Sequence, residues 1–281
     1  MSRKNILIAG GDIRQTYCGE KLSGQYRVYY AGFDSAHRPE PLPDTDKCSY
    51  AVLPVPPPDN SGKIYTPLSD KPLYTADIGN MLSADAVIFA GTAPEKTAGF
   101  FPSHKVISYT QQEELALRNA VSTAEGAVML ALEQLPLTLN GMSVLIVGMG
   151  RIGTALGNIL KGFGSDITAA ARNGRGFAKA ELSGLKHIHT DNITGDFRLV
   201  FNTAPQLIFT EELLEKFPEN TLFIDLASKP GGFDLTAAEK LGRKVIHALG
   251  LPGKKAPVTA GYAVADTIME IINERENAYD R

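Results

Sequence analysis

Residues 143–153 read Ser-Val-Leu-Ile-Val-Gly-Met-Gly-Arg-Ile-Gly, and this stretch decides the fold. The apolar run 143–147 predicts a buried β-strand, and the helical spacing of 154–161 predicts a helix that follows the glycine turn. In such a unit the first glycine permits a tight turn, the second lets backbone approach a pyrophosphate, and the third lets helix and strand pack closely. The N-terminus of the helix adds free N–H groups and partial positive charge. We therefore predict a dinucleotide site, with a purely structural turn as the alternative, formed by Gly148, Met149, Gly150, Arg151, Ile152 and Gly153.

The end of the next predicted strand, 166–170, indicates which dinucleotide is bound. An acidic residue there accepts hydrogen bonds from the ribose of NAD, whereas cations suit the 2′-phosphate of NADP. The chain instead continues Ala171-Arg172-Asn173-Gly174-Arg175, with no carboxylate. Arg172 and Arg175 can meet a phosphate with fork geometry, and Asn173 lies between them. The sequence therefore favours NADP as the cofactor, with NAD possible. The alternative is that the two arginines lie in an ordinary solvated loop.

Short apolar runs bounded by glycine or aspartate recur on both sides of this unit. Unbroken runs are typical of parallel strands covered by helices on both faces. The predicted strands are 5–9, 26–31, 51–55, 86–90, 105–109, 143–147, 166–170, 199–202, 222–225 and 244–247. Apolar residues at helical spacing predict a long helix over 112–133 and a final helix over 260–276 that could return to the first domain, with a polar tail, 273–281, that frays. We expect an α/β chain with two doubly wound parallel-sheet domains, flavodoxin-like and then Rossmann, joined by the long helix. The predicted limits are 1–122 plus 262–281 for the substrate-side domain and 123–261 for the dinucleotide-binding domain.

Loops that leave the predicted strands carry the other candidate residues. The strand 5–9 enters Gly10-Gly11-Asp12-Ile13-Arg14, which lacks a third glycine and suits a carboxylate better than a second dinucleotide. Pro54 and the run Pro56–Pro58 force the chain out of the sheet, as a stiff connection or a wall of the site. Thr203, Ala204 and Pro205, then Ala227 and Ser228, follow strands at the edge where a Rossmann sheet binds its cofactor. Lys229, Lys254 and Lys255 supply cations for an acidic substrate, although each loop is also explained by turn chemistry.

Composition bounds the remaining possibilities. The 281 residues suffice for two domains, and 43% hydrophobic with 21% charged residues excludes wholesale disorder. A net charge of −3 argues against a nucleic-acid partner. Two cysteines, Cys18 and Cys48, cannot form a disulfide framework or a four-sulfur metal site, and are typical of reduced thiols in the cytoplasm. No apolar stretch is long enough to span a membrane, and His187 and His189 lack nearby ligands for a metal.

Taken in order, these motifs resemble the dipicolinate synthase A-subunit family. The resemblance spans nearly the whole chain, and it departs from the family in the proline cluster after Val55 and at Ser122, where the family tends to have proline. The matching segments are Gly10-Gly-Asp-Ile-Arg-Gln15, Leu53-Pro-Val55, Ser122-Thr-Ala-Glu-Gly126, Gly148-Met-Gly-Arg-Ile-Gly153, Asn202-Thr-Ala-Pro205, Asp225-Leu-Ala-Ser-Lys-Pro-Gly-Gly232, Gly250-Leu-Pro-Gly253, Ala256-Pro257 and Thr259-Ala-Gly261.

The resemblance implies oxidation of dihydrodipicolinate, derived from 4-hydroxytetrahydrodipicolinate, to dipicolinate with NADP or NAD as hydride acceptor. It also implies a partner, which is a second, flavoprotein-like subunit, together with a location in the cytoplasm of the mother cell of a sporulating bacterium; a homo-oligomer is possible. Glu125 and Lys229 are the candidate proton acceptors, with a helix-surface carboxylate as the alternative for Glu125. The candidate holders of a dicarboxylate are Arg14, Thr92, Arg118, Thr123, Lys229, Gly253 and Lys254.

Two other functions remain open on the sequence alone. One is another NADP-dependent dehydrogenase of a small carboxylic acid, which would need a histidine–carboxylate pair or an arginine clamp; His247 ends a strand, but the sequence shows no partner for it. The other is a non-catalytic nucleotide-binding subunit of a two-subunit enzyme.

Overall fold

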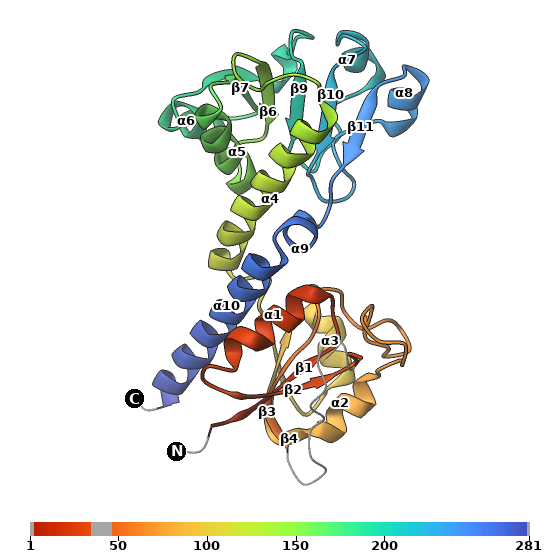
Figure 1. Ribbon diagram of the computed structural model, residues 1–281, viewed down its shortest axis with the longest axis vertical. Coiled ribbons are helices and arrows are strands. Elements are labelled where there is room, and N and C mark those ends of the chain that lie inside the picture. Colours follow the sequence, from red (N-terminus) through yellow and green to blue (C-terminus); the bar gives the residue numbers. More distant parts are fainter. Residues whose placement is uncertain (1–2, 35–46, 280–281) are drawn as a thin grey trace. The chain divides into compact units, whose positions relative to one another are not determined.

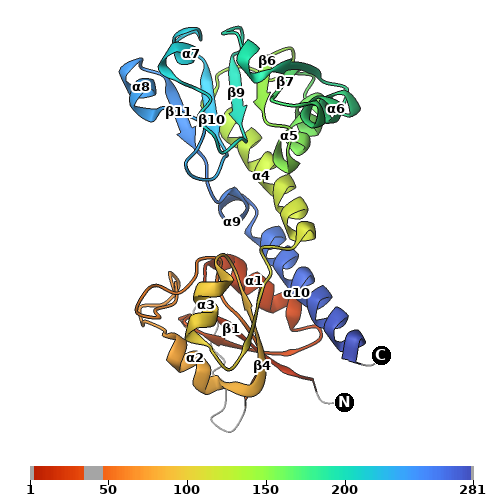
Figure 2. The ribbon, with the colours of Figure 1, turned by 180° about the vertical axis from the view of Figure 1, so that it is seen from behind.

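The computed structural model describes residues 3–34 and 47–279. The chain divides into two compact units, and each is described by itself (Figures 1 and 2). Unit 1 consists of Met1–Arg118 with Ala256–Arg281, and unit 2 consists of Asn119–Lys255. The helix α4 (Glu113–Gln134) passes from one unit into the other.

Unit 1 is built on a five-stranded, wholly parallel sheet in the order β2-β1-β3-β4-β5. This order is that of flavodoxin-like folds and confirms the predicted class. The strands are β1 (Asn5–Ala9), β2 (Arg27–Ala31), β3 (Cys48–Val52), β4 (Leu82–Ala90) and β5 (Lys105–Ser108). The helices are α1 (Ile13–Leu22), α2 (Thr75–Met81), α3 (Pro94–Phe100) and α10 (Pro257–Tyr279), together with the start of α4.

Side chains of alternate residues in β1 enter the two cores of unit 1. Ile6 and Ile8 pack with residues of α1 and α10 on one face, and Leu7 packs with Ile78 of α2 on the other. The figures show α1 and α10 side by side, and α2 and α3 on the opposite face of the sheet. Both faces of the strand are therefore buried, which is why its sequence is an unbroken apolar run.

Unit 2 is built on a six-stranded parallel sheet in the order β11-β10-β9-β6-β7-β8. Its strand order reverses between β6 and β9, as in a Rossmann sheet, so the second half of the predicted fold class is also confirmed. The strands are β6 (Ser143–Val147), β7 (Asp166–Ala171), β8 (Lys186–His189), β9 (Leu199–Asn202), β10 (Leu222–Asp225) and β11 (Lys244–His247). The helices are α5 (Arg151–Gly162), α6 (Gly174–Leu182), α7 (Glu211–Glu215), α8 (Leu235–Lys240) and α9 (Leu251–Lys255), with the rest of α4.

The same alternation organises the core of unit 2. Ile146 packs with Val128 of α4 and Leu156 of α5, whereas Val147 lies in the core that includes α7 and α8. The two faces of β6 are thus covered, and its carboxyl end is where the chain turns at Gly148. The carboxyl edge of the sheet is therefore formed by the loops that follow its strands.

Three predicted features differ from the structure. The strand predicted at 51–55 is β3, Cys48–Val52, and it ends before Pro54 because proline has no N–H for the sheet. The short helices α2, α3, α7, α8 and α9 were not predicted, and Lys254 and Lys255, assigned to a loop, lie in α9. The prediction of a frayed tail was wrong for residues 273–279, which continue α10. Residues 280–281 lie outside the described part of the chain. Lys4 holds this last turn through a 2.7 Å ion pair with Glu276.

Candidate functional site

The glycine turn after β6 has the geometry that its sequence predicts. Gly148 has φ +93°, a conformation that side chains rarely allow, and its N–H donates to the Ala170 carbonyl at 2.9 Å. A Cβ added to Gly153 would lie 1.9 Å from the Gly148 carbonyl oxygen. The first turn of α5 therefore lies against the glycine turn only because Gly153 has no side chain.

The N-terminus of α5 is left open for a ligand. Gly150 is its N-cap, makes no side-chain capping hydrogen bond, and has nothing within 4 Å of the place a Cβ would occupy. Met149 is 5% exposed and packs in the core, so only its backbone can meet a cofactor. An uncapped helix end beside free space fits a pyrophosphate, whose oxygens can accept from backbone N–H groups.

Thr203 supports the turn from the end of β9. Its hydroxyl lies 3.0 Å from both the Val147 and the Gly148 carbonyl oxygens and donates toward them. The hydroxyl proton is thus committed to the turn. This contact assigns Thr203 a supporting position beside the predicted cofactor site, while Ala204 is half-buried and Pro205 exposed next to it.

A cavity of about 380 Å³ lies beyond the ends of β7, β8 and β9. Arg172, the first residue after β7, lines it and donates from Nη1 to Gln206 Oε1. Asn173 caps α6 by accepting from the Gly176 N–H at 3.1 Å, and Arg175 is exposed in the first turn of that helix. Of these three predicted positions, only Arg172 lines the cavity. The sequence missed the rest of the lining, which comprises Thr190, Asp191, Gln206, Leu207, Ile208, Thr210, Glu212, Leu213 and Lys216.

The expectation that His247 has no partner was wrong. His247 Nδ1 lies 3.9 Å from Asp225 Oδ2, because the two residues face each other in the register of β10 and β11. Lys229 is exposed in the loop that follows β10, and no ion pair to it occurs within the described residues. Sequence reasoning placed the Asp225 and His247 strand ends correctly but could not know that β10 and β11 are neighbours.

Arg14 and Thr92, two of the predicted substrate residues of unit 1, both have intramolecular partners. Arg14 Nε and Nη2 donate to the two carboxylate oxygens of Asp12 at 2.9 and 2.7 Å, and this pairing raises the Arg14 pKa above its ordinary value. Thr92 Oγ1 donates to the Val55 carbonyl at 2.9 Å. The glycine turn before α1 thus already holds one carboxylate, its own.

The predicted residues on and after α4 lie in different surroundings. Thr123 Oγ1 donates to the Asn119 carbonyl at 2.7 Å, and Glu125 is exposed on the helix. Arg118 is paired with Glu270 at 3.0 Å, so its charge is already compensated. Gly253 and Lys254 lie on α9, where Lys254 is exposed. These residues are divided between the two units, and their assembly around one substrate stays a prediction.

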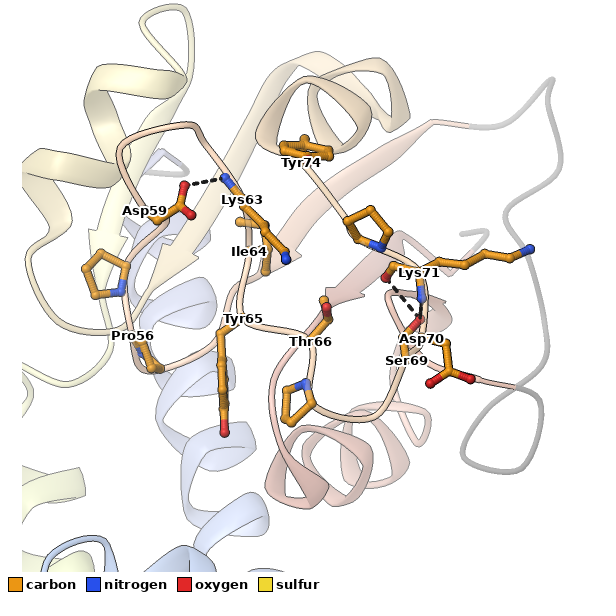
Figure 3. Close-up of a pocket in the computed structure, with 13 residues that line it drawn as sticks. Pro56, Asp59, Lys63, Ile64, Tyr65, Thr66, Ser69, Asp70, Lys71 and Tyr74 are labelled. Atoms are coloured by element: carbon orange, nitrogen blue, oxygen red, sulfur yellow. Dashed lines mark hydrogen bonds between the residues drawn. The ribbon is translucent and has the colours of Figure 1, made fainter.

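A larger cavity, of about 620 Å³, lies in unit 1 in the loop between β3 and α2 (Figure 3). Asp59 and Lys63 lie on one side of it and Ser69 to Lys71 on the other. Lysines and aspartates both line it, together with Pro56 and Pro57 of the proline cluster. None of the predicted catalytic, cofactor or substrate residues does. Because charges of both signs line this cavity, its side chains indicate no particular class of ligand.

The described residues show neither a metal centre nor a membrane-spanning helix. Among residues 3–34 and 47–279, no group of three His, Cys, Asp or Glu side chains gathers as metal ligands would. No helix in these ranges has the length and apolarity that a membrane crossing requires. Cys18 and Cys48 are both buried and neither is in a disulfide, and burial raises the pKa of the Cys18 thiol.

Two family models match two successive segments of the chain. Residues 5–110 match the family model described as the N-terminal domain of the dipicolinate synthase A-subunit. Residues 117–229 match the NAD binding domain of D-isomer specific 2-hydroxyacid dehydrogenases. The dipicolinate synthase A-subunit of Bacillus subtilis (strain 168) is 30% identical over 286 residues, which cover 96% of each chain.

Solved structures agree with this match. The dipicolinate synthase A-subunit from Bacillus subtilis has a TM-score of 0.87 and 29% identity, covering 99% of this chain and 98% of its own. Its counterpart from Bacillus halodurans has a TM-score of 0.85 and 28% identity, covering 95% and 97%. A transhydrogenase from Sinorhizobium meliloti has a TM-score of 0.70 over 97% and 94% of the two chains, but its 14% identity shows only a shared fold.

Proposed function

Because the chain belongs to the dipicolinate synthase A-subunit family, we propose that it oxidises dihydrodipicolinate, formed from 4-hydroxytetrahydrodipicolinate, to dipicolinate with NADP. The observation that carries the proposal is the open N-terminus of α5 behind the Gly148–Gly153 turn. This turn lies in a segment that matches a hydroxyacid dehydrogenase NAD binding domain, which supports a nicotinamide-dependent oxidoreductase. A bound nicotinamide accepts the hydride.

The choice of NADP rests on the end of β7. Arg172 and Arg175 are exposed there. The stretch Ala171–Arg175 contains no carboxylate that could accept a hydrogen bond from a ribose 2′-hydroxyl. Gln206 holds the Arg172 guanidinium over the cavity beside β7 through an interaction that a 2′-phosphate can replace. We propose that both arginines bind this phosphate and that the cavity takes the adenosine.

The substrate is a planar dianion, which needs cationic or N–H-rich holders on two sides. We propose Arg14, Thr92, Lys229 and Lys254 as residues that bind it. Arg14 is fixed in place by Asp12, which uses two of its nitrogens and leaves Nη1 without a hydrogen bond to any described residue. Arg118 is a weaker candidate because Glu270 already compensates it.

The direct test is hydride transfer by the isolated chain. Freshly prepared dihydrodipicolinate and NADP are mixed with the protein, and reduced cofactor is followed by its absorbance. Turnover that yields dipicolinate supports the proposal. Binding of NADP without turnover, until the second, flavoprotein-like subunit is added, would instead support the non-catalytic subunit. No binding of either nicotinamide dinucleotide would overturn both.

One observation favours a second candidate, a dehydrogenase of another small carboxylic acid. Such enzymes use a histidine–carboxylate pair, and the structure places His247 beside Asp225. A panel of 2-hydroxy and 2-amino acids in the same assay separates the two, because only one substrate class will give reduced cofactor at a useful rate.

The family also motivates proposals about partners and location. We propose that the chain acts beside the second subunit in the mother-cell cytoplasm of a sporulating bacterium. Co-purification of that subunit, and the mass of the isolated chain in solution, test the partner and the homo-oligomer separately.

A further inference from the structure

Three polar side chains meet at the carboxyl ends of neighbouring strands in unit 2. Asn202 ends β9, Asp225 ends β10 and His247 ends β11, and the register pairs Asn202 with Asp225 and Asp225 with His247. Figure 2 shows the three strands side by side. Because β9 adjoins β6, this row continues from the strand that carries the glycine turn along the ligand-binding edge.

Asp225 is the centre of the row. It is 1% exposed, and its Oδ1 accepts from Asn202 Nδ2 at 2.7 Å and from the Ala227 N–H at 3.2 Å. Its Oδ2 accepts from the Gly232 N–H at 3.0 Å and also faces His247. A buried carboxylate without such donors would be costly, so these contacts keep the charge and fix its direction.

His247 connects this buried charge to the accessible edge. Its side chain is 29% exposed, against 1% for Asp225, and its Nδ1 faces the carboxylate at an ion-pair distance of 3.9 Å. No described residue forms a hydrogen bond with its Nε2, so this nitrogen is available to a ligand. Within the described residues, Asp225 is the titratable group that pairs with His247, and Lys229 lies on the loop that leads to Gly231 beside the ring.

We propose that His247 is the proton acceptor of the oxidation, through Nε2, and that Asp225, held by Asn202, is its positioning residue. The inference rests on the proposed function. In the reaction, one ring C–H bond breaks and its electron pair leaves with the hydrogen as hydride to the nicotinamide. A second ring C–H loses its proton to Nε2, and the electrons of that bond form the new ring double bond. The substrate is oxidised by two electrons, the cofactor is reduced, and the imidazolium that forms lies beside the Asp225 charge.

The geometry favours His247 over the two proton acceptors expected from the sequence. Glu125 is exposed on α4, and no described residue orients its carboxylate by a hydrogen bond. Lys229 must lose a proton before it can accept one, and it too is exposed without an ion-pair partner among the described residues. His247 alone of the three faces a buried group that stabilises its charged form.

The first test compares His247→Gln with His187→Gln. His187 is also on a strand of this sheet and also faces a carboxylate, with Nε2 3.0 Å from Glu181, but it lies on β8 at the far edge. We expect kcat for dihydrodipicolinate oxidation to fall about 100- to 10,000-fold in His247→Gln, with NADP affinity unchanged. His187→Gln should retain the wild-type kcat. A His247→Gln variant with more than a third of the wild-type kcat overturns the inference.

A second test separates proton transfer from a structural role. In His247→Ala, added imidazole should restore activity in proportion to its neutral form, because it can occupy the vacated space and accept the proton. The acid limb of kcat against pH should vanish in His247→Gln, and kcat should fall in Asp225→Asn with the KM for NADP unchanged, because the ring loses the carboxylate that orients it. A wild-type acid limb in His247→Gln sinks the inference. If the wild-type chain itself does not oxidise dihydrodipicolinate, the proposed function fails, and the variants are not the cause.

Discussion

Asn202 donates a 2.7 Å hydrogen bond from Nδ2 to Asp225 Oδ1, and both side chains are almost wholly buried. The same amide accepts from the Ala204 N–H at 3.2 Å and so ties the loop after β9 to the end of β10. We expect Asn202→Leu to destabilise the protein by about 2–3 kcal/mol. The buried carboxylate of Asp225 loses a donor, and the N–H and carbonyl of Ala204 lose their partner. Denaturation with guanidinium chloride measures this change.

The control for that variant is Asn158→Leu, since Asn158 is exposed on α5. Its free energy of unfolding should stay within about 0.5 kcal/mol of wild type. Equal stability of the Asn202 and Asn158 variants would show that the buried amide contributes nothing to the strand ends.

Gly153 and Gly162 lie on the same helix and give opposite predictions. A Cβ at Gly153 would meet the Gly148 carbonyl oxygen at 1.9 Å, so Gly153→Ala must push α5 away from the turn. A Cβ at Gly162 meets nothing within 4 Å. Gly153→Ala should lower stability and weaken NADP binding at least tenfold, whereas Gly162→Ala should stabilise by about 0.5–1 kcal/mol. Calorimetric titration with NADP measures the binding, and thermal unfolding measures the stability of each variant. Wild-type NADP affinity in Gly153→Ala would contradict the proposal that the Gly148–Gly153 turn binds the cofactor.

Arg172→Asp should shift the preference from NADP toward NAD. The change removes a fork that can hold a phosphate and adds a carboxylate that can accept from a ribose hydroxyl. We expect the ratio of NADP to NAD affinity to fall by about 10- to 100-fold, as for the loss of a charge-assisted hydrogen bond. Lys240→Asp makes the same charge change on exposed α8 and should leave the ratio alone. Unchanged relative affinities in Arg172→Asp would mean that the phosphate lies elsewhere.

Local signals made the fold predictable. The unbroken runs around Ile146 and Ile8 identify strands buried on both faces, and the glycine spacing locates the turn after β6. Helices α2, α3, α7, α8 and α9 were not predicted because each has seven residues or fewer, too few for an apolar stripe to repeat. The end of α10 was mistaken for a frayed tail, because its polar residues gave no sign that Glu276 would meet Lys4.

The candidate site was less predictable, because its contacts join strands that are distant in sequence. Asp225 and His247 are 22 positions apart, and only the strand order makes them neighbours. Likewise, nothing in the loop after β9 indicates that Gln206 would hold Arg172. The sequence identified the residues at the sheet edge, whereas their pairing required the structure.

The Asp12–Arg14 pair predicts an acid-sensitive part of the stability of unit 1. Although burial alone would raise the pKa of Asp12, the hydrogen bonds and charge of Arg14 outweigh it and hold that pKa below its ordinary value. A carboxyl group whose pKa is lowered by folding contributes stability above about pH 4 and loses it as the pH falls through the folded value. Asp12→Asn keeps an oxygen that can accept from the Arg14 backbone N–H, now 3.1 Å from Asp12 Oδ1. It removes the charge and one of the two oxygens that accept from the Arg14 guanidinium.

We therefore expect Asp12→Asn to lower the free energy of unfolding by about 1–2 kcal/mol at neutral pH, as for a hydrogen bond to a charged group. The difference from wild type should shrink as the pH drops toward about 3, because the wild-type carboxyl then becomes protonated too. Urea denaturation at a series of pH values measures this convergence. Asp85→Asn, an exposed aspartate on β4, should show no such difference at any pH. A gap between Asp12→Asn and wild type that stays constant down to about pH 3 would show that the charge of Asp12 is not what holds Arg14.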